Sequence, residues 1–213
     1  MRIRKARAAG LIVVVAAVAV ALGAHAPVSS PSRVSSPSTA SPSLPPPATA
    51  HVEHRHSARR GSLGEAGGAV PDGTTVFDDA VPGVGNLDPA LLGALRRATA
   101  DAAGDGVELD VDSGWRSRAY QEHLLREAIA KYGSEAAASR WVATPDTSAH
   151  VSGDAVDIGP SGAAAWLSAH GTAYGLCRIY GNEPWHFELR AGAAAHGCPA
   201  MYADPTHDPR MHQ

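Results

Sequence analysis

The segment from Ser148 to Asp157 places a histidine and an aspartate on either side of a glycine. His150 comes before Gly153 in an expected loop, and Asp157 comes after it in an expected strand. Because glycine lets the backbone turn back, we expect both side chains to meet one ion. His186 follows later in the chain and supplies a second imidazole. Two imidazoles and a carboxylate are enough for a catalytic zinc site, which uses three protein ligands and leaves a fourth position for water.

A spare carboxylate accompanies this set, in the fragment Glu183-Pro184-Trp185-His186. A free carboxylate beside an activated water acts as its base. Glu183 is the expected base, because it stands where a strand begins and is able to lean over the metal. Glu188 is the competing candidate, since it shares a strand face with His186. If Glu188 or His196 were a fourth ligand, the zinc would be closed off and purely structural.

An arginine follows a second expected strand. Val107, Leu109 and Val111 alternate with acidic residues, which predicts a half-buried strand. The strand leads into the fragment Ser113-Gly114-Trp115-Arg116-Ser117, in which Arg116 is the positively charged residue. A fixed guanidinium stabilises the negative charge that develops on a carbonyl oxygen during hydrolysis. It also binds a carboxylate through two parallel hydrogen bonds. The alternative is a surface arginine paired with Asp112.

The remaining patterns predict an α+β fold. Helices are expected between Pro89 and Gly104, between Ser117 and Gly133, and at 134–142 and 161–170, from cap residues and helical spacing. Strands are expected at 107–111, 155–158, 177–180 and 185–189, the last two joined by a Gly181-Asn182 hairpin turn. The predicted architecture is a small antiparallel sheet with helices packed on one side and the zinc site on the sheet.

The N-terminal region predicts export. Residues 1–26 combine a basic start, the apolar run Leu11–Leu22 and a small-residue cleavage site, as a signal peptide does. Residues 27–69 are expected to form a disordered Ser/Pro/Gly-rich linker, because Ser or Pro occupies 15 of the positions 27–50. The catalytic domain is expected at 70–203 and a tail at 204–213. We expect a secreted or cell-envelope protein, with membrane anchoring through residues 11–22 if the signal is uncleaved.

The charge balance bears on the kind of partner, and the cysteine content bears on a disulfide. Loss of the signal peptide leaves 14 basic and 21 acidic residues, which argues against nucleic-acid binding. Cys177 and Cys198 are the only cysteines, and in an exported protein such a pair indicates a disulfide. That bond would be worth about 3 kcal/mol. A thiolate metal ligand is the alternative, but it would leave the histidines and carboxylates without a role. We expect a monomer.

Three motifs together resemble a known family. They are Ser-Gly-Trp-Arg-Ser with Gln121, Ser-x-His-x-x-Gly-x-Ala-x-Asp at 148–157, and Glu-Pro-Trp-His at 183–186. In this order they resemble the VanY-type D-alanyl-D-alanine carboxypeptidases, of the zinc D,D-peptidase and hedgehog-like superfamily. The resemblance covers Val76 to Arg190. Trp115 departs from it, since many relatives carry tyrosine there, and the cysteine pair is not part of the shared pattern.

The resemblance implies a role for each matching residue. His150, Asp157 and His186 match the zinc ligands, Glu183 the general base, and Arg116 the arginine that polarises the scissile carbonyl. Ser148 and Gln121 match residues that line the substrate pocket. The implied reaction is removal of the C-terminal D-alanine from peptidoglycan stem peptides.

Two other functions remain open at this point. The same fold also serves endopeptidases that cut peptidoglycan cross-links or stem peptides, and it serves non-catalytic, zinc-stabilised wall-binding modules. The presence of both Glu183 and Arg116 argues against a binding module, which needs neither. A serine enzyme is disfavoured, because Ser148 and Ser152 lack the Ser-x-x-Lys or Gly-x-Ser-x-Gly setting.

Overall fold

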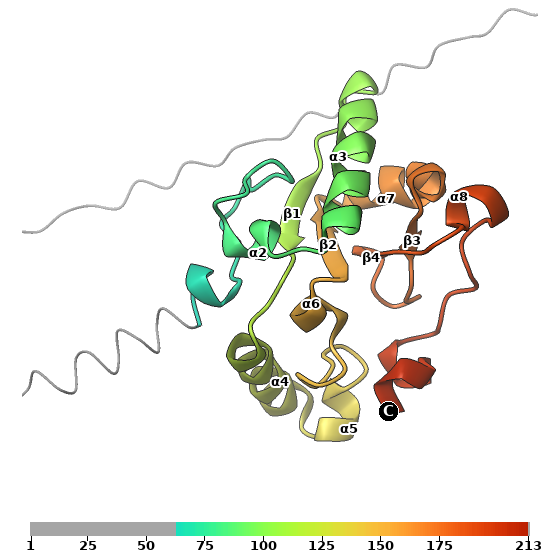
Figure 1. Ribbon diagram of the computed structural model, residues 1–213. Coiled ribbons are helices and arrows are strands. Elements are labelled where there is room, and N and C mark those ends of the chain that lie inside the picture. Colours follow the sequence, from blue (N-terminus) through green and yellow to red (C-terminus); the bar gives the residue numbers. More distant parts are fainter. Residues whose placement is uncertain (1–62, 213) are drawn as a thin grey trace, which may run out of the picture. The chain divides into compact units, whose positions relative to one another are not determined.

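The computed structural model describes residues 63–212, so the predicted signal peptide and most of the predicted linker lie outside the described residues. A four-stranded antiparallel sheet crosses the described part of the chain (Figure 1). No helix within residues 63–212 is long and apolar enough to cross a membrane. In spatial order the strands are β1 (Asp110–Ser113), β2 (Ala155–Gly159), β4 (His186–Leu189) and β3 (Leu176–Arg178).

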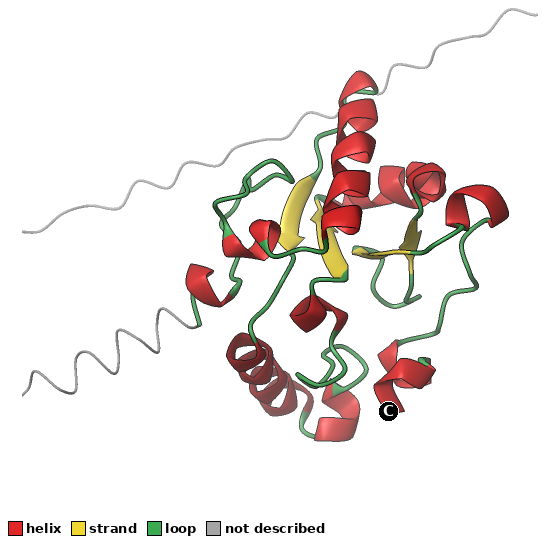
Figure 2. Cartoon of the chain, viewed as in Figure 1, coloured by secondary structure: helices red, strands yellow, loops and turns green. Residues whose placement is uncertain are grey.

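Two helices, α3 (Pro89–Gly104) and α7 (Ser161–His170), pack on one face of the sheet (Figure 2). The Asp88 side chain caps α3 by accepting hydrogen bonds from the backbone N–H groups of Ala90 and Leu91. The helix then buries the side chains that recur at helical spacing, including Leu91 and Leu95. They join a single core with apolar side chains of the sheet, namely Val111, Val156, Ile158, Leu176 and Phe187. The predicted α+β fold with a small antiparallel sheet is confirmed.

The opposite face of the sheet is polar but also buried. Successive side chains of a strand point to opposite faces. Val156 and Ile158 therefore serve the apolar core, while Asp157 between them points to the other side. Every residue of β2 is buried, so this second face must itself be covered. The cover comes from α4 (Arg118–Tyr132) and α6 (Ala149–Ser152), whose residues line a cavity with Asp157.

The helix α4 and several short helices connect the elements of the sheet and its covering helices. Ser117 caps α4, and Gly133 ends it in the left-handed conformation, as the sequence predicts. The remaining elements are the 3-10 helices η1 (Glu65–Gly67), η2 (Gly171–Tyr174), η3 (Pro205–His207) and η4 (Pro209–His212), and the α-helices α2 (Pro82–Gly85), α5 (Glu135–Ala138) and α8 (Ala193–His196). The third helix was predicted at 134–142 but ends at Ala138.

Two strand predictions need correction. The first strand begins at Asp110 rather than Val107, because its partner β2 ends at Gly159, where Pro160 and then α7 follow. The last two strands pair as predicted but are joined by residues 179–185, not by a two-residue Gly181-Asn182 turn. The backbone N–H of Gly181 instead donates to the carbonyl of Tyr202, so this loop pairs with the C-terminal chain.

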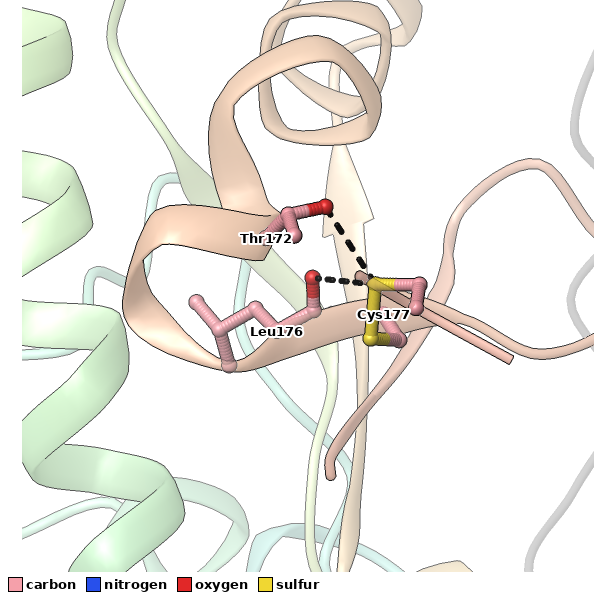
Figure 3. Close-up of a disulfide and its surroundings, with 4 residues drawn as sticks. Thr172, Leu176 and Cys177 are labelled. Atoms are coloured by element: carbon pink, nitrogen blue, oxygen red, sulfur yellow. Dashed lines mark hydrogen bonds between the residues drawn. A yellow bond between two sulfur atoms is a disulfide. The ribbon is translucent and has the colours of Figure 1, made fainter. Parts of the chain in front are cut away.

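The C-terminal residues belong to the fold, although a tail was predicted from residue 204. Asp204 and Asp208 are buried, and η3 and η4 follow one another there. The predicted disulfide Cys177–Cys198 is present and ties β3 to the chain that leads into this segment (Figure 3). The Thr172 hydroxyl donates a hydrogen bond to Sγ of Cys198 over 3.3 Å.

The N-terminal edge of the described chain also docks on the domain. The backbone N–H of Ser117 donates to the carbonyl of Gly67, and an added Cβ at Gly68 would lie 2.2 Å from the carbonyl oxygen of Trp115. Ordered packing thus begins a few residues before the predicted boundary at 70.

Candidate active site

Three side chains predicted as ligands meet on the buried polar face of the sheet. One nitrogen or oxygen atom from each of His150, Asp157 and His186 lies within 4.8 Å of those of the other two. Asp157 Oδ1 is 3.4 Å from His150 Nε2 and 3.1 Å from His186 Nδ1. Two imidazole nitrogens and a carboxylate oxygen converging in this way fit a divalent metal held by three protein ligands.

The backbone explains why these three side chains converge. Asp157 on β2 and His186 on β4 are direct partners in the antiparallel ladder, so their side chains point to the same face. His150 lies in the short helix α6, not in a loop as predicted. Gly153 ends this helix with φ of +82° and turns the chain directly into β2. This turn brings His150 back over Asp157.

Each histidine is oriented by a hydrogen bond on the side away from the group. His150 Nδ1 donates to the carbonyl oxygen of Gly114 over 2.8 Å, which leaves Nε2 facing Asp157. His186 Nε2 lies 3.3 Å from Glu188 Oε1, which leaves Nδ1 facing Asp157. Histidines that bind metals usually donate their other ring N–H to a carbonyl or carboxylate in this manner. Glu188 therefore lies on the far side of His186 and does not close the site as a fourth ligand.

Two of the three members, Asp157 and His150, have the ionisation states that metal ligands need. Burial would raise the pKa of Asp157, but His150, His186 and Arg116 hold it well below its usual range. Burial and the charge of Arg116 lower the pKa of His150. Burial would lower the pKa of His186 as well, but its hydrogen bonds to Asp157 and Glu188 raise it to about 9. The aspartate is thus ionised at neutral pH, and His150 presents a neutral imidazole.

Glu183 lies at the edge of the group, as predicted for a base. It is 6% exposed, and its Oε2 is 3.9 Å from His186 Nδ1. Burial raises the pKa of Glu183 to about 7, against the lowering effect of His186. By contrast, two arginines hold Glu188, and its pKa is lowered to about 2 by hydrogen bonds that outweigh burial. Of the two candidates, Glu183 has the proton affinity suited to a general base at neutral pH.

Arg116 points into the group and is fixed on three sides. Its Nη2 donates to Asp157 Oδ2 over 3.0 Å, its Nε to Ser113 Oγ over 2.8 Å, and its Nη1 to Gln121 Oε1 over 3.2 Å. The pairing of β1 with β2 shifts register between Val111 and Ser113, a bulge that places Ser113 opposite Asp157. Arg116 is therefore not a surface residue paired with Asp112, which was the alternative.

A cavity of about 470 Å³ opens over these residues. Ser148 and Gln121, both predicted at the substrate pocket, line it together with the three candidate ligands, Arg116 and Glu183. Gln121 is buried, and its side-chain amide donates to the carbonyl of Ala143. The outer wall carries the stacked rings of Tyr132 and Trp141, both partly exposed.

Sequence reasoning missed the contribution of the C-terminal segment. Pro205 and Met211 line the cavity, and Arg210 bonds to Glu188 behind His186. The sequence carries little signal for this, because 22 positions separate Arg210 from Glu188. Tyr180, whose ring centroid is 5.1 Å from that of His186, was also missed.

The chain is similar to a known family and to individual known proteins. The family model described as VanY, D-alanyl-D-alanine carboxypeptidase, matches residues 85–191. A D-alanyl-D-alanine carboxypeptidase of Enterococcus faecalis is 33% identical over 40% of this chain and 41% of its own length. The chain thus spans less than half of that relative.

Solved structures of similar proteins include a vancomycin-resistance D,D-pentapeptidase VanY in complex with Zn(II). It is 30% identical to this chain, with a TM-score of 0.46, and the match covers 48% of this chain and 72% of that protein's chain. A second solved structure is VanYB in complex with D-alanine-D-alanine, with 30% identity and a TM-score of 0.47. This match covers 51% of this chain and 74% of that protein's chain.

The matched family region contains all three candidate ligands together with Arg116 and Glu183. It also extends over half of the chain. This protein belongs to the VanY D-alanyl-D-alanine carboxypeptidase family.

Proposed function

We propose that this protein is a zinc-dependent peptidase that removes the C-terminal D-alanine from peptidoglycan stem peptides ending in D-Ala-D-Ala. The observation that carries the proposal is the position of a buried carboxylate, Glu183, at the rim of the His150, Asp157 and His186 group. A purely structural metal site has no use for such a base. Membership of the VanY family supports the choice of substrate.

His150, Asp157 and His186 would hold the zinc ion through Nε2, a carboxylate oxygen and Nδ1. When bound, zinc acts as a Lewis acid that activates water and polarises a carbonyl group. Zinc suits this set because it accepts mixed nitrogen and oxygen ligands and uses three of them in catalytic sites. Among the described residues the group comprises these three members, which is the number of protein ligands that a catalytic zinc ion would need.

Glu183 acts as the general base and then as the general acid. It accepts a proton from the attacking water, whose oxygen bonds to the carbonyl carbon of the scissile peptide. The carbon–nitrogen bond then breaks, and Glu183 returns the proton to the leaving amine of D-alanine. Burial raises the pKa of Glu183 toward neutral pH, which helps the same group to gain and then lose a proton.

Arg116 supplies positive charge where the substrate carbonyl develops negative charge. Its hydrogen bonds to Asp157, Ser113 and Gln121 fix the guanidinium before substrate arrives, so little reorganisation is needed during the reaction. Ser148 and Gln121 line the pocket that receives the peptide end.

We further propose that the protein acts outside the cytoplasm. The pattern of residues 1–26 supports export, and the Cys177–Cys198 disulfide suits an oxidising compartment. N-terminal sequencing of the protein recovered from culture medium and from membranes would test this. Cleavage after Ala26 is expected, and an intact N-terminus in membranes would instead indicate an anchor.

The decisive experiment measures D-alanine release from a muramyl pentapeptide ending in D-Ala-D-Ala, using protein from residue 63 onward. We expect release that a chelator abolishes and zinc restores. Parallel incubation with cross-linked wall fragments tests the endopeptidase alternative. Bound zinc with cleavage only of the cross-linked fragments would replace the carboxypeptidase assignment, and bound zinc without any cleavage would favour a wall-binding module.

A further inference from the structure

The C-terminal segment, residues 204–212, packs directly behind the candidate metal site. It lies beyond the family match, which ends at residue 191. Its two aspartates are buried to an unusual degree for charged residues, with Asp204 2% and Asp208 0% exposed. Buried charges need partners, and the partners of Asp208 lead to the metal site.

Asp208 holds Arg210 in place. Arg210 Nε donates to Asp208 Oδ2 over 2.9 Å, and the hydroxyl of Tyr180 donates to the same oxygen over 3.0 Å. The backbone N–H of Arg210 donates to the other oxygen, Asp208 Oδ1, over 3.0 Å. The guanidinium therefore has one well-defined orientation.

In that orientation Arg210 forms a two-point bond with Glu188. Nη1 donates to Oε2 over 2.8 Å, and Nη2 donates to Oε1 over 3.1 Å. This fork geometry fixes the plane of a carboxylate as well as its charge. Arg190 also pairs with Glu188, but at Oε2, with 2.7 Å between the atoms.

The distinction between the two oxygens of Glu188 matters for His186. Oε1 is the oxygen that lies 3.3 Å from His186 Nε2, and Arg210 is the arginine bonded to it. A carboxylate held by two guanidinium groups is an acceptor only, so the imidazole must carry its N–H on Nε2. That leaves Nδ1 as the atom directed at Asp157 and the metal position.

We propose that Arg210 is a positioning residue for the metal site, which acts through Glu188 to fix the orientation and tautomer of His186. This inference rests on the proposed function, because it takes His186 as a metal ligand. Groups that hold a ligating histidine in this way typically contribute 10- to 100-fold to metal affinity. The C-terminal segment thereby contributes to the orientation of a metal ligand and does not only pack against the site.

The test compares zinc affinity, measured by competition with a chromophoric chelator, in four proteins. Arg210→Met removes the two-point bond at similar side-chain length, and we expect zinc affinity to fall about 10-fold or more. Arg210→Lys should recover part of it. Arg140→Met is the matched control, since Arg140 anchors the same segment through Asp204, with 3.0 Å between Nε and Oδ2, without touching Glu188. It should lower thermal stability and leave zinc affinity unchanged.

A second measurement distinguishes an effect of Arg210 on ligand geometry from an effect on packing of the C-terminal segment. With Co(II) in place of zinc, the visible absorption spectrum reports ligand geometry. It should shift in Arg210→Met and stay as in the wild type in Arg140→Met. Wild-type affinity and spectrum in Arg210→Met would overturn the inference and make Arg210 a structural anchor only.

If Arg210→Met does not fold, Glu188→Gln tests the same link at its other end, since Arg210 acts through this carboxylate. Its zinc affinity should also fall, and unchanged affinity would overturn the inference. Zinc binding is measured independently of hydrolysis. A wild-type protein that binds zinc but releases no D-alanine would therefore overturn the proposed activity alone and leave the role of Arg210 standing.

Discussion

Asp157 on β2 and His186 on β4 face one another across the sheet, with Asp157 Oδ1 3.1 Å from His186 Nδ1. They are register partners in the ladder, so regular strand pairing sets the spacing of two candidate ligands. The third, His150, depends on the turn at Gly153. The geometry of the site therefore rests on one pair of strands and one turn.

The turn at Gly153 gives the first prediction. Gly153 has φ of +82°, and an added Cβ would lie 2.6 Å from the carbonyl oxygen of Asn86. Gly153→Ala should therefore shift α6 and weaken zinc binding by about 10-fold or more, on the scale of losing support for a ligand. Gly106→Ala is the matched control, because Gly106 has φ of +73° with open space around its Cβ position. It should cost about 1 kcal/mol of stability without changing zinc affinity, and equal affinity in the two variants would contradict the prediction.

Replacement of the proposed base should separate binding from catalysis. Glu183→Gln keeps the shape of the side chain but cannot accept a proton, so we expect kcat to fall about 100- to 10,000-fold. Zinc affinity should stay within a few-fold of the wild type, because Glu183 lies outside the group of three ligands. Steady-state D-alanine release and chelator competition measure the two quantities. Glu108→Gln, at an exposed position, serves as the control, and undiminished kcat in Glu183→Gln would exclude this residue as the base.

The pH dependence of kcat/KM should show the ionisation of the same carboxylate. The base must be deprotonated before it accepts a proton, so activity is lost as the pH falls through its pKa. Burial raises the pKa of Glu183 to about 7 in the protein itself, and a bound dication nearby would lower it. The acidic limb should therefore have a midpoint no higher than about pH 7, and a midpoint well above pH 7 would point to another group.

Acid stability should depend on Asp204. Hydrogen bonds from Thr206, His207 and Arg140 outweigh burial and lower its pKa to about 2. A group whose folded pKa is depressed stabilises the fold above its unfolded pKa and loses that contribution as the pH falls through the folded value. On acidification from pH 5 to 2, the wild type should lose about 2 kcal/mol more stability than Asp204→Asn.

Urea unfolding at each pH measures this difference. Asp146→Asn is the control, since Asp146 also pairs with an arginine but is 78% exposed in its side chain. Surface pairs of this kind contribute little. An acid dependence of Asp204→Asn equal to that of the wild type would contradict the predicted role of this carboxylate.

Local patterns in the sequence were sufficient for most elements and for the group of candidate ligands, which the structure brings together. Asp88 and Ser117 mark the starts of α3 and α4 because a side-chain cap is a local interaction. His150, Asp157 and His186 could be named in advance because the residue types and spacing of a three-ligand site are restrictive. The disulfide followed from the presence of two cysteines in a chain that carries an export pattern.

Interactions between distant parts of the chain decided the rest. The Gly181-Asn182 turn was wrong because residues 179–182 pair with the C-terminal chain, a partner that no local pattern reveals. Residues from 204 onward were predicted to be a tail, and only the folded structure gives Asp208 and Arg210 their buried partners. The sequence by itself determined which residues could hold a metal. The tertiary structure decided how they are oriented, because orientation depends on contacts between segments far apart in the chain.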